Sequence, residues 1–226
     1  LVSLDLALRM LKKTESVNAS LANRIKRVFG QAQQNLLCAD IEQLPLADAS
    51  VDMIFSNLAI QWCNDLDAAF AGMHRVLRTD GLLTFSTLGP DTLKELRAAS
   101  KTDGERVSVS RFFDMHDIGD ALVRAGFSAP VLDVERVVLT YDDAVDVMRD
   151  LKAIGAHNAA DGRGRGLQGR DFLKKITANY EQFRREGKLP ATFEVVYGHA
   201  WKPASRPKTK MDLEAGFAPV TFHGKK

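Results

Sequence analysis

Short apolar runs alternate with segments of helical periodicity through the first half of this chain. The runs LVSLD (1–5), NLLCAD (35–40), VDMIFSNLAI (51–60) and LLTFSTLG (82–89) have the character of strands. Between the last two, DLDAAFAGMHRVLR (65–78) places its apolar residues on one face of a helix. Strands that alternate with helices form βαβ units, so we predict an α/β fold with a mostly parallel sheet and helices on both faces.

Polar side chains follow three of these predicted strands, at the points where the strands end. Asp5 and Asp40 close the first two strands, and Asn57 follows the third. Because the carboxyl ends of parallel strands meet at one edge of a sheet, these side chains are expected to lie close together. For one acid alone, a strand-end turn or a helix cap is an equally simple explanation, but the repeated pattern favours a ligand site.

The second half of the chain predicts a different organisation. PVLDVERVVLTY (130–141) and FEVVYGHAW (193–201) read as strands, and two helices are expected between them, separated by the loop DGRGRGLQGR (161–170). We therefore divide the chain into four parts: a core over 1–139, a helical insertion over 140–190, a final core strand over 191–203 and a poorly ordered basic tail over 204–226.

Composition restricts the classes of protein that remain. The 226 residues are 45% hydrophobic and 27% charged, which is typical of a soluble globular protein. No apolar run approaches the roughly 18 residues needed to span a membrane, and no signal peptide is evident, so a cytoplasmic protein is expected. The cysteines, Cys38 and Cys63, lie in apolar contexts without the spacing of metal ligands, and they predict two buried thiols in a reducing compartment and no metal site.

Charge is distributed unevenly along the chain. Residues 38–80 hold seven acids and two arginines, whereas residues 156–210 hold twelve Lys and Arg and five acids. The basic second half indicates an acidic partner, although a solvated lysine-rich surface would give the same pattern. Nucleic acid is a weaker candidate, because the aromatic residues are not interleaved with the basic ones as a stacking surface requires.

The stretch from ADIEQLPLADAS through FSTLGPDTLKELR (39–97) resembles the class I S-adenosylmethionine-dependent methyltransferases, which have a Rossmann-like fold. The phrases SNLAIQW, MRDLKAIGAHN and LPATFEVVYGHAW resemble, more narrowly, the biotin-pathway family that methylates the free carboxylate of malonyl-acyl carrier protein. Members of that family carry a strand and an acid-x-Gly-x-Gly loop before the segment that corresponds to 1–5. We expect the sequence to be incomplete at its N-terminus, with a break in the sheet between the strands at 1–5 and 51–56.

The resemblance implies S-adenosyl-L-methionine as the cofactor and assigns residues to it. Asp5 corresponds to the acceptor of the ribose hydroxyls, Asp40 to the acceptor of the adenine amine, and Asn57 to a residue facing the methionyl group. Apolar neighbours expected to flank these groups are Leu6, Met10, Ile41 and Leu58.

The insertion resembles the family's lid over the active site. A malonyl carboxylate is already ionised at neutral pH, so no catalytic base is expected, only a cation that places it. Arg111, Arg149 and Lys152 are the candidate anchors, and the last two are spaced to share one helical face. The alternative is that they are surface charges that pair with Asp146 or Asp150.

The carrier protein is expected to dock on basic residues of the insertion, by electrostatic steering. The candidates are Arg163, Arg165, Arg170, Lys174 and Lys175. A monomer is expected. Two other functions fit the same fold: a protein-arginine hydroxylase like the complex I assembly factor that these sequences also resemble, and a non-catalytic binding protein.

Overall fold

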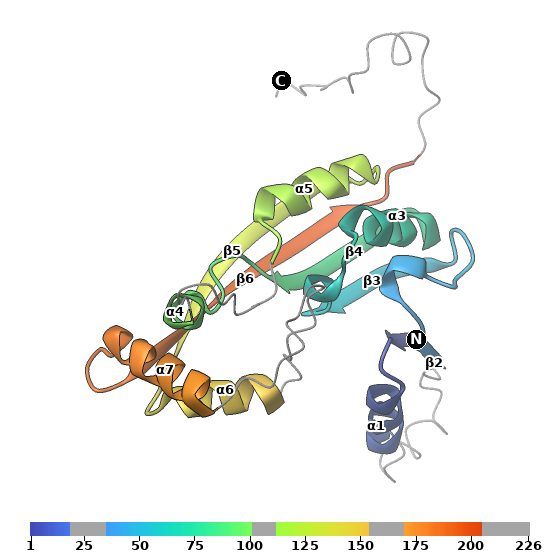
Figure 1. Ribbon diagram of the computed structural model, residues 1–226. Coiled ribbons are helices and arrows are strands. Elements are labelled where there is room, and N and C mark those ends of the chain that lie inside the picture. Colours follow the sequence, from blue (N-terminus) through green and yellow to red (C-terminus); the bar gives the residue numbers. More distant parts are fainter. Residues whose placement is uncertain (19–34, 101–111, 154–169, 205–226) are drawn as a thin grey trace, which may run out of the picture.

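The computed structural model describes residues 1–18, 35–100, 112–153 and 170–204, and its elements follow the chain in alternation (Figure 1). The first half contains β1 (Val2–Asp5), α1 (Leu8–Asn18), β2 (Asn35–Cys38), the 3-10 helix η1 (Ile41–Gln43), β3 (Val51–Asn57), η2 (Ile60–Trp62), α3 (Leu66–Val76) and β4 (Leu77–Leu88). The second half contains α4 (Lys94–Ala99), α5 (Met115–Arg124), β5 (Ser128–Tyr141), α6 (Ala144–Ala153), α7 (Arg170–Tyr180), η3 (Glu181–Phe183) and β6 (Leu189–Trp201).

The strands form two sheets. Four of them lie in the order β3-β4-β6-β5, in which β3 runs parallel to β4 while β6 runs antiparallel to both β4 and β5. The other two, β1 and β2, form a separate parallel pair. Within the described residues no ladder joins β1 to β3, which is the position where the sequence predicted a break. The α/β fold is confirmed, but the sheet is mixed where the sequence predicted a mostly parallel one, because β6 runs antiparallel to both of its neighbours.

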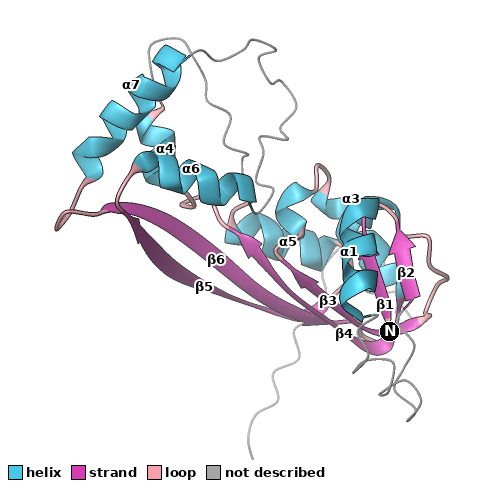
Figure 2. Ribbon diagram, turned by 90° about the horizontal axis from the view of Figure 1, so that it is seen from below, coloured by secondary structure: helices cyan, strands magenta, loops and turns pink. Residues whose placement is uncertain are grey.

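One hydrophobic core lies between the four-stranded sheet and the helices α3 and α5 (Figure 2). Phe70 and Met73 of α3 pack there with Leu122 of α5 and with Leu83 and Phe85 of β4. Helix α3 begins where the sequence predicts it, because the Asp65 side chain accepts a hydrogen bond from the backbone N–H of Ala68 at 2.9 Å. Its apolar residues then recur at helical spacing and cover the sheet.

A second core lies at the far end of β5 and β6, where α4, α6 and α7 gather in both views (Figures 1 and 2). Tyr180 of α7 is fully buried there, and its hydroxyl donates to the backbone oxygen of Pro190 at 2.9 Å. Leu96 of α4, Val147 of α6 and Leu189 of β6 pack around it. The helical insertion thus has a core of its own, and α4, which the sequence placed with the first part of the chain, contributes to it.

Some element boundaries differ from the sequence-based prediction. A helix was expected to start at Asp91, but α4 starts at Lys94, after Leu93 adopts the left-handed conformation with φ 56°. The strand expected at 193–201 begins earlier, at Leu189, because its first residues pair with the end of β5, where Tyr141 lies opposite Leu189. Local propensity carries no information about such long-range pairing.

The two cysteines differ from each other in environment. Cys63 is buried, and burial together with the nearby carboxylates raises the pKa of its thiol to about 12. Cys38, at the end of β2, is exposed. The expectation of two buried thiols is therefore wrong for Cys38, because β2 belongs to the small two-stranded sheet and its last residue lies outside both cores.

Close packing at Gly198 of β6 gives a test of the sheet. A β-carbon at this position would lie 2.6 Å from Phe85 Cε1 and 2.7 Å from Leu132 Cδ2. We expect Gly198→Ala to lower the free energy of unfolding by about 1–3 kcal/mol, through overpacking. Denaturant unfolding followed by circular dichroism measures this change in the free energy of unfolding. The matched control is Gly72→Ala in α3, where the nearest atom is 3.8 Å away, so helix propensity predicts unchanged or greater stability. Equal effects of the two substitutions would contradict this packing.

Candidate functional site

Asp5 and Asp40 lie at the same edge of the β1–β2 pair. The two strands are parallel, Asp5 is opposite Cys38, and Asp40 follows two residues later. The Asp5 carboxylate accepts a hydrogen bond from the N–H of Ala7 at 2.7 Å, and the Asp40 carboxylate caps η1 by accepting from Glu42 at 2.9 Å. Asp5 therefore closes a turn and Asp40 caps a helix, which are the roles considered as alternatives to ligand binding. Both acids also lie at the carboxyl end of the β1–β2 pair, as the sequence predicted.

The apolar neighbours of these acids differ in their exposure to solvent. Leu6 and Met10, on either side of the turn into α1, are 70% and 55% exposed. Ile41 is partly buried and packs against the first core. Leu6 and Met10 therefore present apolar surface to solvent near Asp5, and their contact with a cofactor ring stays a prediction.

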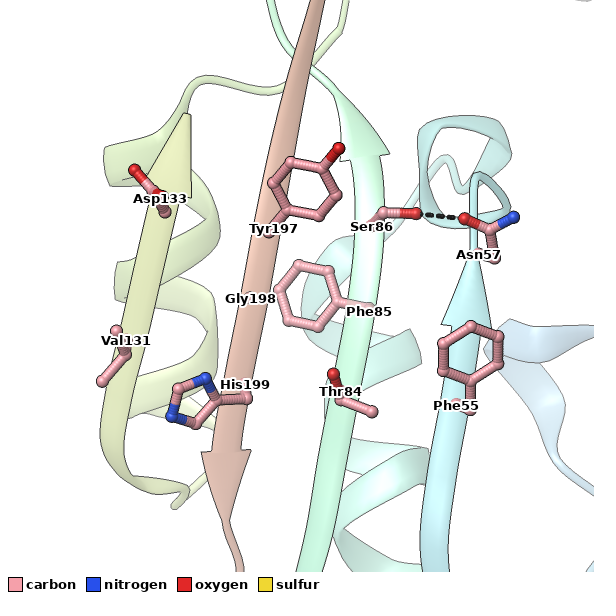
Figure 3. Close-up of a pocket in the computed structure, with 10 residues that line it drawn as sticks. All are labelled: Phe55, Asn57, Thr84, Phe85, Ser86, Val131, Asp133, Tyr197, Gly198 and His199. Atoms are coloured by element: carbon pink, nitrogen blue, oxygen red, sulfur yellow. Dashed lines mark hydrogen bonds between the residues drawn. The ribbon is translucent and has the colours of Figure 1, made fainter. Parts of the chain in front are cut away.

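Asn57 lies at the carboxyl end of β3, where Ser86 of the neighbouring β4 donates to its Oδ1 at 2.5 Å (Figure 3). Ser86 also holds the next residue: the N–H of Leu58 donates to the Ser86 backbone oxygen at 3.0 Å and to its Oγ at 3.2 Å. Leu58 is itself exposed and has a positive φ of 49°. The pairing of β3 with β4 thus fixes the Asn57 amide and turns the chain sharply after it.

A pocket on the open face of the four-stranded sheet includes Asn57 (Figure 3). The other residues that line it are Phe55, Thr84, Phe85, Ser86, Val131, Asp133, Tyr197, Gly198 and His199. Asp5 and Asp40 do not line this pocket. Of the three polar residues at strand ends, the structure therefore brings Asp5 and Asp40 together at one sheet edge and places Asn57 at the edge of the other sheet.

Sequence reasoning missed several polar side chains at the ends of β3 and β4. The buried Gln61 donates to the backbone oxygen of Leu58 at 2.5 Å and accepts from the Thr87 hydroxyl at 3.3 Å. Ser56 is buried, and its hydroxyl has no hydrogen-bond partner in the part of the chain that the structure describes. An unpaired buried hydroxyl is unfavourable, so a ligand at this edge would gain from satisfying it. The cluster SNLAIQW was the available signal.

The structure treats the three candidate anchors of the substrate carboxylate differently. Arg149, on α6, forms an ion pair with Asp146 one turn earlier, which is the surface pairing considered as its alternative. Lys152 is exposed on the same helix. Arg111 lies outside the described residues, so the structure does not place it.

The candidate carrier-binding residues are placed only in part. Lys174 and Lys175 are exposed on α7, next to the buried Ile176 that anchors the helix in the second core. Arg170 is the first residue of α7. Arg163 and Arg165 lie outside the described residues. The surface of α7 therefore presents two adjacent ammonium groups to solvent.

Two further observations limit the kinds of site. Among the described His, Cys, Asp and Glu side chains, no three gather in a way that could hold a metal ion. None of the helices within the described ranges is long and apolar enough to cross a membrane.

Comparisons with known proteins identify the family of the chain. A family described as "Methyltransferase domain" matches residues 1–85. The malonyl-[acyl-carrier protein] O-methyltransferase of Methylovorus sp. (strain MP688) is 64% identical over 221 residues, which are 98% of this chain and 72% of that protein. The protein of the same name from Laribacter hongkongensis (strain HLHK9) is 59% identical, over 92% of this chain and 70% of its own length. The chain belongs to this methyltransferase family.

Solved structures show the same fold. A putative methyltransferase from Bacillus halodurans C-125 has a TM-score of 0.56 and 18% identity, and the match covers 90% of this chain and 83% of that one. The YcgJ protein of Bacillus subtilis has a TM-score of 0.60 and 14% identity, with 90% and 82% covered. The resemblance to the malonyl-[acyl-carrier protein] O-methyltransferase family that the sequence indicated is confirmed by the relatives of 64% and 59% identity.

Proposed function

We propose that this chain carries the S-adenosyl-L-methionine-dependent methylation of the free carboxylate of malonyl-acyl carrier protein, giving the methyl ester that primes biotin synthesis. The observation that carries the proposal is identity of 64% over 98% of the chain to a relative of that name. Each of the eight relatives compared, down to 36% identity, bears the same name. No feature of the described residues favours the hydroxylase or a non-catalytic protein over this function.

The residues at the strand ends fit the cofactor. Asp5 offers a carboxylate held by one hydrogen bond, with exposed Leu6 and Met10 beside it, and suits the ribose hydroxyls. Asp40 would accept from the adenine amine beside Ile41. Asn57 and Leu58 would face the methionyl group. When bound, the sulfonium supplies an electrophilic methyl group.

The chain's own task in such a reaction is alignment and exclusion of water, because displacement at a methyl carbon proceeds in line. The malonyl carboxylate needs no base, since it is ionised at neutral pH. A cation that paired with the attacking oxygen of the carboxylate would lower its nucleophilicity. The cation should therefore bind the carboxylate oxygen that does not attack. Lys152, on the helix that packs in the second core, is the described residue that suits this role, with Arg111 as the undescribed candidate.

The helical insertion would cover the reactants and receive the carrier protein. Its core of α4, α6 and α7 stands at the end of the molecule toward which β3 and β4 run (Figure 1). The exposed Lys174 and Lys175 would steer an acidic carrier, together with Arg170 and the undescribed Arg163 and Arg165. We expect a monomer in the cytoplasm.

The cofactor assignment predicts that Asp5→Ala weakens the binding of S-adenosyl-L-methionine to the full-length protein by at least about tenfold, since hydrogen bonds to a charged group are lost. Isothermal titration calorimetry measures the dissociation constant. Asp52→Ala is the matched control. Asp52 is an exposed acid that pairs with Arg78 at the start of β3, away from the carboxyl ends of the strands. An unchanged dissociation constant for Asp5→Ala would remove Asp5 from the site.

The function predicts transfer of a labelled methyl group from the cofactor to malonyl-acyl carrier protein. Succinyl-acyl carrier protein should react more slowly because its carboxylate lies one methylene farther from the thioester. Acetyl-acyl carrier protein has no free carboxylate and should not react. Scintillation counting of the precipitated carrier measures the three rates. The proposal would be refuted if all three carriers were labelled equally, or if no carrier were labelled.

The anchor assignment predicts that Lys152→Ala lowers kcat/KM for malonyl-acyl carrier protein by at least about tenfold while the affinity for the cofactor stays unchanged. Arg111→Ala should act in the same way. Arg149→Ala is the internal comparison, with a smaller effect expected because Asp146 already engages its guanidinium. Full activity of both Lys152→Ala and Arg111→Ala would exclude a role for these two cations.

A further inference from the structure

Two buried glutamates lie just beyond the carboxyl end of β4. Glu95, on α4, and Glu194, on β6, are each only 7% exposed. A carboxylate is rarely buried unless it is paired, because burial removes its hydration. Neither residue belongs to the cofactor or anchor sets, so their burial needs its own explanation.

Glu194 holds the loop that follows β4. Its Oε2 accepts a hydrogen bond from the N–H of Asp91 at 2.8 Å, and the Arg136 guanidinium lies 3.5 Å from its Oε1. The same guanidinium is 3.2 Å from the Asp91 carboxylate. A β-carbon at Gly89 would lie 2.6 Å from Glu194 Oε2, so only glycine lets this carboxylate reach the loop. The Glu194 carboxylate thus holds the loop at Asp91, directly through its N–H and indirectly through Arg136.

The Glu95 side chain bonds β6 at a point beyond the end of β4. The last paired residues of β4 and β6 are Leu88 and Val195. Beyond them, the Glu95 carboxylate accepts from the backbone N–H of Thr192 at 3.1 Å and from its hydroxyl at 2.5 Å. A side chain here takes the place of a neighbouring strand, and it satisfies a backbone donor that the end of β4 leaves unpaired.

Main-chain bonds complete the connection. The N–H of Gly89 donates to the Glu194 backbone oxygen at 2.8 Å, and the N–H of Leu93 donates to that of Thr192 at 2.6 Å. The hydroxyl of Thr92 also donates to the Glu194 backbone oxygen, at 3.1 Å. The segment from Gly89 to Glu95 is therefore fastened to β6 along its whole length.

This segment lies between the two parts of the proposed site. On one side it follows directly from Ser86 and Thr87, which hold Asn57 and Gln61 at the strand ends. On the other side Leu93 and Leu96 belong to the second core, which also contains α6 and thus the helix that bears Lys152. The segment therefore connects the strand ends that bear Asn57 with the core that contains α6.

We propose that Glu194 and Glu95 are positioning residues for the acyl substrate. They do not contact the reactants, but they fix the loop and the helices that place the malonyl carboxylate against the methyl group. The inference rests on the proposed function. Displacement of a reacting group by about 1 Å can cost about a hundredfold in rate. Loosening the attachment of the Gly89–Glu95 segment to β6 should therefore slow the reaction and reduce the preference for malonyl over longer acyl groups.

The test compares Glu194→Gln and Glu95→Gln, which keep the shape of each side chain and remove its charge. The matched control is Glu135→Gln, since Glu135 is an exposed neighbour on β5 that bonds the Tyr197 hydroxyl. At a temperature well below every Tm, we expect the first two variants to lose about 10- to 100-fold in kcat/KM for malonyl-acyl carrier protein. The preference for malonyl over succinyl carrier should fall, and the Kd of S-adenosyl-L-methionine should stay unchanged. Glu135→Gln should behave as the wild type.

Each other outcome has a definite meaning. If both variants lower Tm but keep kcat/KM and the malonyl preference, the glutamates serve folding alone and the proposal is overturned. If they weaken cofactor binding as much as they slow methylation, they act on the whole site and the proposal is likewise overturned. If the wild-type protein itself transfers no methyl group, the proposed function fails first and the positioning role fails with it.

Discussion

The pairing of β6 with both β4 and β5 is the constraint on which the rest of the structure depends. Val196 and Ala200 of this strand pack in the first core, and Leu189 and Ala191 pack in the second. Because one continuous strand serves both cores, the helical insertion cannot take an arbitrary orientation over the sheet. Antiparallel ladders on both sides satisfy the backbone of β6 from Val195 to Trp201, and toward the second core the ladder with β5 continues to Leu189.

The sequence was sufficient to predict the features that depend on local pattern. Apolar runs bounded by polar residues predicted β1, β2 and β3, and the helical spacing of apolar residues at 65–78 predicted α3. The parallel arrangement predicted Asp5, Asp40 and Asn57 at one edge; Asp5 and Asp40 share theirs, whereas Asn57 lies in the other sheet. The family assignment needed more than pattern, because it depended on particular phrases such as SNLAIQW.

Features that depend on distant partners could not be predicted in this way. The bond between Glu95 and Thr192 joins residues 97 positions apart, and in the sequence Glu95 is indistinguishable from an ordinary helical surface acid. The early start of β6 at Leu189 has the same origin, since it depends on β5. Cys38 was misjudged because an apolar neighbourhood in the sequence was taken for a buried one, although its strand belongs to neither core.

The local bonds of Asp5 and Asp40 do not compete with a role in binding. Each carboxylate has two oxygens, and the bond to Ala7 or Glu42 engages one of them. Such a bond also restricts the rotation of the side chain, so less conformational entropy is lost when a ligand binds to the other oxygen. A turn or cap at a strand end is therefore compatible with the proposed role of each carboxylate toward a ribose or an amine.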